Sequence, residues 1–117
     1  MSTTNGAWEY FLSAAQLLSS AGPIKQRLAV AYTTHLAALN TEEIPREFRD
    51  EFVAIGSSLS TVAPLRGETA IQASIRKMSD FEAAGHAQRI INLLGGLVRM
   101  QVQPRQTVLR AVNSGDA

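Results

Sequence analysis

The sequence predicts an all-α protein, a compact antiparallel bundle of about five helices with a bend at Ser79–Glu82. Apolar residues recur at spacings of three and four along most of the chain, which is the pattern of amphipathic helices. Capping residues, glycines and prolines divide this pattern into five segments, and no stretch is predicted as a strand. A chain of 117 residues can bury the core of one domain, which we expect to cover residues 1–103.

A glycine and a proline separate the first two predicted helices. The first helix covers residues 7–20 and follows good capping residues. Gly22 and Pro23 end it, since glycine is common just past a helix end and proline at the next beginning. The second helix then covers residues 23–40. The predicted inward residues of the two helices include Trp8, Phe11, Leu12, Ala15, Leu18, Ile24, Leu28, Ala31, Leu36 and Leu39.

Prolines bound the third helix on both sides. A short connection over residues 41–45, with one tight turn, leads to Pro45, which takes an early helical position. Ala63-Pro64 ends the third helix, and the fourth covers residues 68–78. The third helix is strongly amphipathic, with charged residues opposite an apolar stripe of Phe48, Phe52, Ile55, Leu59 and Val62.

The apolar pattern changes face between the fourth and fifth helices. On a helical wheel the apolar residues of the fourth helix lie in one narrow arc, and those of the fifth centre on nearly the opposite side. One straight helix cannot bury both arcs. Ser79 and Glu82 form a capping-box pattern, in which each side chain bonds the backbone N–H of the other residue. We therefore predict a bend there and a fifth helix over residues 80–101, with Ala84, Ala87, Ile91, Leu94 and Val98 facing the core.

Glycines and a proline mark the second half of the fifth helix. Gly95-Gly96 lies among good helix formers, and each glycine costs about 1 kcal/mol relative to alanine. Either the helix frays there or another backbone approaches closely, and close packing is the favoured interpretation. Few apolar residues follow Pro104, so residues 104–117 are predicted to form a partly mobile tail, with a short docked helix as the alternative.

Composition argues against several functional classes. The net charge of +1 provides no general attraction for nucleic acid or a membrane. Residues 1–65 carry four basic and six acidic side chains, and residues 66–117 carry seven and four. A solvated surface with complementary charges within the protein is the favoured interpretation, and an external anionic partner is the alternative. No cysteine is present, which excludes disulfides and thiolate metal sites and favours a cytoplasmic location. Neither a signal peptide nor a membrane-spanning segment is predicted.

Candidate partner-binding residues are apolar side chains of the first and fifth helices. Phe81 lies off both apolar arcs; burial within the monomer is the favoured interpretation, and contact with another chain is the alternative. An apolar surface joining the first helix to the end of the fifth would exceed what a small monomer can cover, which suggests self-association. The candidates are Trp8, Phe81, Leu94, Leu97 and Val98.

A candidate polar site lies on one face of the fifth helix. Glu82, His86 and Arg89 follow one another at spacings of four and three residues. Glu82 is expected to raise the pKa of His86 and could make it a proton carrier, although an ordinary solvated pair is the favoured interpretation. Two possible ligands do not make a closed metal site, so neither a metal nor a cofactor is predicted.

A candidate anion site precedes the fourth helix. Arg66 and Gly67 stand at its start, where exposed backbone N–H groups and a guanidinium could bind phosphate or carboxylate. Glu68 opposes this interpretation because its carboxylate already complements the positive end of the helix. Ordinary capping is therefore the favoured interpretation.

The sequence contains no recognisable catalytic pattern such as a nucleophile elbow or a phosphate-binding loop. We therefore expect a non-enzymatic protein–protein interaction module or small accessory subunit, with self-association as one form of that interaction. The alternative is a nucleic-acid-binding regulator that uses the fourth and fifth helices as a helix-turn-helix. Its contacts would come from Arg76, Lys77, His86, Gln88, Arg89 and Asn92, against the opposing charges of Asp80 and Glu82.

Overall fold

The computed structural model describes the backbone of residues 6–116 and the side chains of residues 6–101. The prediction of an all-α bundle of five helices is confirmed, and the described part of the chain contains no strand. The α-helices are α1 (Ala7–Leu18), α2 (Ile24–Ala31), α3 (Arg46–Ser58), α4 (Ala70–Lys77) and α5 (Asp80–Asp116). A π-helix, η2 (Tyr32–Leu36), continues α2, and a 3₁₀ turn, η3 (Thr41–Glu43), precedes α3.

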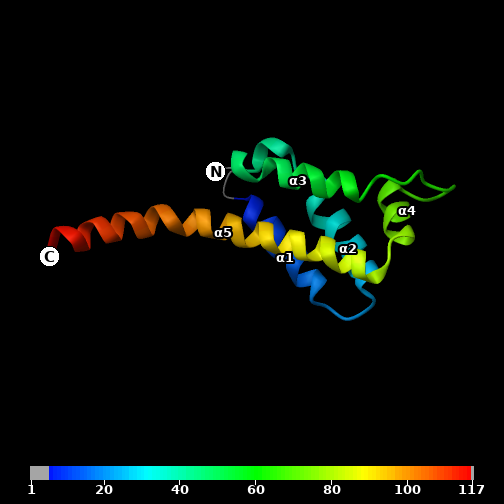
Figure 1. Ribbon diagram of the computed structural model, residues 1–117, viewed down its shortest axis with the longest axis horizontal. Coiled ribbons are helices and arrows are strands. Elements are labelled where there is room, and N and C mark those ends of the chain that lie inside the picture. The colour runs from blue at the N-terminus through cyan, green and yellow to red at the C-terminus, as the bar shows by residue number, and fades with distance from the viewer. Residues whose placement is uncertain (1–5, 117) are drawn as a thin grey trace.

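The long α5 is the axis of the bundle. It packs against α1, α2 and α3, while α4 packs on α2 at one end (Figure 1). The last part of α5 extends beyond the other helices, which is why the molecule measures 65 Å in one direction and 27 and 22 Å in the others. The core contains Phe11 and Phe52, whose rings meet edge to face with centroids 6.1 Å apart.

The predicted bend between α4 and α5 is confirmed. The Ser79 hydroxyl accepts a hydrogen bond from Glu82 N–H (3.0 Å), and a Glu82 carboxylate oxygen accepts one from Ser79 N–H (2.8 Å). Met78 has extended backbone angles, with φ −88° and ψ 160°, so the helical path is broken just before the cap. This reciprocal pair satisfies two N–H groups that a helix start otherwise leaves without partners.

The predicted buried face of α5 is partly wrong. Of the five residues expected to face the core, Ala87 and Leu94 are partly buried and pack against it, whereas Ala84, Ile91 and Val98 are exposed. A step of one residue rotates a helix face by about 100°. The inward residues of α5 are instead Ala83, Ile90, Leu93 and Leu97.

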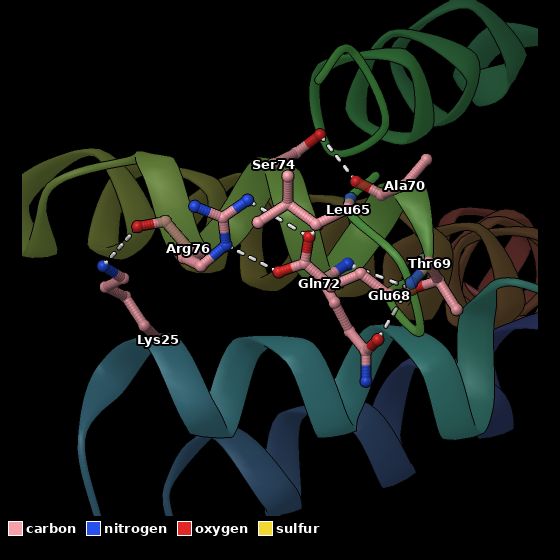
Figure 2. A network of polar contacts seen from close by, with 8 residues as sticks. All are labelled: Lys25, Leu65, Glu68, Thr69, Ala70, Gln72, Ser74 and Arg76. Carbon is pink, nitrogen blue, oxygen red and sulfur yellow. Dashed lines mark hydrogen bonds and ion pairs between the residues drawn. The ribbon is translucent and has the colours of Figure 1, made fainter. Parts of the chain in front are cut away.

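Three of the observed helix ends differ from the predicted ones. The second helix leaves α geometry at Ala31 and continues as η2, and the third ends at Ser58 rather than near Ala63. The α4 helix begins at Ala70 because Thr69 and Gln72 form a second capping box, with bonds of 3.0 and 2.9 Å (Figure 2). Sequence analysis had overlooked this pair.

The predicted close packing at the glycine pair is confirmed for Gly96. A Cβ atom at Gly96 would lie 2.7 Å from Cε1 of Phe48. The aromatic ring of Phe48, which belongs to α3, therefore packs directly on the backbone of α5. At Gly95 the nearest atom is 3.6 Å away and belongs to the flexible Arg99 side chain. The absence of a side chain at Gly96 therefore sets how closely α3 and α5 approach.

The fifth helix does not end near Gln101 as predicted but continues to Asp116, past Pro104. The side chains of residues 102–117 lie outside the described part of the chain. The partly mobile tail therefore stays a prediction.

Replacing Ser79 with alanine is expected to lower the free energy of unfolding by about 0.5–2 kcal/mol, because the Glu82 N–H loses its acceptor. Urea unfolding measures the change. Ser57→Ala, at an exposed position of α3, is the matched control and should stay within about 0.5 kcal/mol of wild type. Equal stability of the two variants would contradict the capping role.

Alanine substitutions at two glycines of α5 should have different effects. Gly85→Ala is expected to stabilise the monomer by up to about 1 kcal/mol, because a Cβ there meets no atom within 4 Å and alanine favours the helix. Gly96→Ala should be less stable than Gly85→Ala by about 1–2 kcal/mol, because the Phe48 ring must move. Urea unfolding at low protein concentration measures both, and equal gains would contradict close packing at Gly96.

Candidate functional site

The exposed side of α5 carries a row of mainly apolar residues, which we call the outward stripe. It consists of Phe81, Ala84, Gln88, Ile91 and Val98, at spacings of three, four, three and seven. Phe81 is 88% exposed, and Ile91 and Val98 are 39% and 38% exposed. The stripe exists because α5 is apolar over more than the arc that the core covers.

A groove runs beside the outward stripe where α1, α2 and α5 meet. Its volume is about 270 Å³. Apolar side chains dominate its lining, and the two polar ones, Ser19 and Gln88, carry no charge. Phe81 lies three residues before the groove residue Ala84, one turn away on the same side of the helix. The other lining residues are Ala15, Leu18, Ile24, Ala87 and Ile91.

The predicted partner-binding residues fall into two groups. Leu97 is buried in the core, and Trp8 and Leu94 are partly buried and pack against it. Phe81 and Val98 are exposed, so the favoured expectation of a buried Phe81 is wrong. Phe81 takes the second helical position after the Ser79 cap, on the side of α5 that the other helices leave exposed.

Two of the three residues of the predicted polar site bond other groups. Arg89 forms an ion pair with Glu51 of α3, with Nε and Oε2 2.8 Å apart, and this pair holds the pKa of Glu51 below its usual value. Glu82 serves the Ser79 cap. His86 lies beside Arg89, with Nδ1 and Nη1 3.5 Å apart. His86 therefore lies near both residues, while Arg89 and Glu82 each make their hydrogen bonds elsewhere.

Burial, and then the charge of Arg89, lower the pKa of His86 below its ordinary value. The predicted upward influence of Glu82 is present but smaller, so the expected direction is wrong. His86 also lines a hollow of about 260 Å³ with Lys77 and Glu82. No group of residues that could hold a metal ion occurs in the described part of the chain.

The predicted anion site lies in the loop before α4. Gly67 has a positive φ of 83°, which allows the turn, and Arg66 is exposed. The adjacent Glu68 carboxylate accepts bonds from Leu65 N–H (3.0 Å) and from the Arg76 guanidinium (2.6 Å), as Figure 2 shows. This carboxylate occupies the place where an anion would approach, so the geometry gives the anion hypothesis no support.

Sequence analysis missed the groove because its two walls come from segments far apart in the chain. Ile24 and Ala84 line the same groove but are separated by sixty residues. The width of the apolar arc of α5 was the available signal, since residues 83–98 offer apolar side chains on two adjoining faces. We assigned Ala84, Ala87 and Ile91, which line the groove, to the core.

Comparisons with known protein families, curated proteins and solved structures found no match to this chain. Within residues 6–116, no helix combines the length and the apolar character that crossing a membrane requires.

The pKa of His86 leads to a pH-dependent stability. Because this pKa is lower in the folded than in the unfolded chain, the unfolded state binds more protons as the pH falls through the ordinary histidine range. Wild type should therefore lose stability relative to His86→Gln between about pH 7 and pH 5. Urea unfolding at several pH values measures this. A relative gain by wild type on acidification would show that attraction to Glu82 dominates.

Proposed function

We propose that this protein is a non-enzymatic protein–protein interaction module whose contact surface is the outward stripe with the adjoining groove. The observation that carries the proposal is an 88% exposed Phe81 beside an uncharged, mainly apolar groove. A cytoplasmic location, which the lack of cysteine favours, is part of the same proposal.

The exposed ring of Phe81 costs free energy as long as it stays in contact with water. A phenylalanine side chain removes on the order of 150–250 Å² from water when it is covered, at about 25 cal/mol per Å². Aromatic side chains beside apolar recesses are typical centres of binding energy in protein interfaces. The groove between two helices and the start of a third also has the form that accepts one face of an amphipathic helix.

The nucleic-acid alternative receives less support from the charges around α4 and α5. The guanidiniums of Arg76 and Arg89 are paired with Glu68 and Glu51. The exposed side chain of Asp80 places negative charge at the start of α5. Nucleic-acid binding would depend steeply on salt, whereas contacts through an apolar stripe would not. A gel shift at low and moderate salt distinguishes the two classes.

The test of the proposed function is affinity capture with matched surface variants. Phe81→Ser removes the exposed ring, and Val53→Ser removes a 48% exposed side chain from α3, away from the groove. Both variants should stay within about 0.5 kcal/mol of wild-type stability in urea, because neither side chain is buried. Immobilised wild type and Val53→Ser are expected to capture the same partner protein, which can be an untagged copy of this chain. Immobilised Phe81→Ser is expected not to capture that partner.

Two outcomes would contradict the proposal. Retention of the same proteins by Phe81→Ser would show that the ring is not part of a contact surface. Retention that disappears after nuclease treatment would favour the nucleic-acid-binding regulator instead.

A further inference from the structure

We infer that the occupant of the groove is a second copy of this chain, joined by a two-fold axis at Ala84 and Gly85 with the α5 helices antiparallel. This inference rests on the proposed function, because it names the partner of the same surface. Three observations support it: the placement of Phe81 relative to the groove, the small residues between them, and the distribution of charge along α5.

The first observation is that a protruding side chain and a recess lie on the same side of one helix. The α5 wall of the groove extends from Ala84 to Ile91, so its middle lies six or seven residues beyond Phe81. That separation is about 10 Å along the helix axis. A surface that carries both partners of a contact is self-complementary under a two-fold axis, since each copy can insert its ring into the other.

The second observation concerns the point where the helices would cross. If Phe81 of one copy enters the groove near Gln88 of the other, the antiparallel register places Ala84 of each copy opposite Gly85 of the other. Both residues are exposed, and no atom lies within 4 Å of a Cβ built at Gly85. Small residues allow two helix axes to approach to about 8 Å, the close end of ordinary helix packing.

The third observation is the charge along α5. Asp80 and Glu82 make its start acidic, and Arg89 follows about two turns after Glu82. In a parallel pair the acidic starts of the two copies would lie side by side and repel each other. In the antiparallel register these acidic starts lie apart, with Asp80 at the level of the partner's Arg89, a residue that is paired with Glu51 of its own chain, and the helix dipoles oppose each other favourably. The groove between these ends carries no charge.

The size of this contact indicates a weak dimer. Two phenylalanine rings and the small residues between them would bury less than about 1,200 Å², the range of transient complexes. A micromolar dissociation constant is therefore expected. The dimer should form on concentration and should not be needed for folding, since the core of the monomer is complete without Phe81.

Disulfide trapping tests the two-fold axis directly, because the chain contains no native cysteine. Gly85→Cys places one thiol beside the axis, where its symmetry mate lies close enough for a disulfide. Val53→Cys, equally a single exposed position but on α3, is the matched control. Under mild oxidation at equal concentration, Gly85→Cys should form covalent dimers about tenfold faster than Val53→Cys. Adding Phe81→Ser to Gly85→Cys should abolish this advantage.

Dimerisation of Gly85→Cys no faster than that of Val53→Cys, or at a rate that Phe81→Ser does not change, would overturn the symmetric dimer. Sedimentation of wild type and Phe81→Ser, neither of which contains cysteine, controls for an effect of the introduced cysteine. A wild type that stays monomeric at high concentration would also overturn the symmetric dimer. The proposed function would survive either result if affinity capture still returned a different protein in a Phe81-dependent way. Failure of both experiments would remove both proposals.

Discussion

The hydrogen-bonded cap at Ser79 is the local constraint on which the arrangement of α5 depends. With Met78 extended and the hydroxyl of Ser79 bonded to Glu82 N–H, α4 cannot continue into α5. The cap thereby determines where α5 begins. A helix that continued straight from α4 would have to expose one of two apolar arcs. The break allows both helices to bury a face, and it leaves the ring of Phe81 on the side that faces solvent.

Contacts farther along α5 hold the same orientation. The Phe48 ring of α3 lies against the backbone of α5 at Gly96. Arg89 of α5 forms an ion pair with Glu51, which also belongs to α3. The ion pair is exposed, so it adds little free energy, and its geometric effect is to keep α3 on one side of α5. Since α3 occupies that side and α1 with α2 another, the outward stripe remains uncovered in the monomer. The proposed interaction uses apolar surface that the bundle has too few helices to cover.

Local signals were sufficient to predict the number of helices, the cap at Ser79 and the close approach at Gly96. Each depends on residues adjacent in sequence or on the absence of a side chain. The buried face of α5 was predicted wrongly because two adjoining apolar arcs compete, and only the positions of α1, α2 and α3 decide between them. The ion pair between Glu51 and Arg89 joins residues thirty-eight positions apart, which no local pattern reveals. The π-helix after Ala31 likewise has no sequence signal that we recognise.

The most direct test of this account is a dilution series of the ¹⁵N-labelled chain followed by NMR, from about 10 μM to 1 mM, a range that brackets a micromolar dissociation constant. The account predicts concentration-dependent amide shifts along the outward stripe and the groove, from Phe81 to Ile91 in α5 and from Ala15 to Ser19 at the end of α1. Amides of α3 around Val53 should not shift. Spectra that do not change with concentration, or changes centred on α3, would contradict the claim that the outward stripe of α5 binds a second copy.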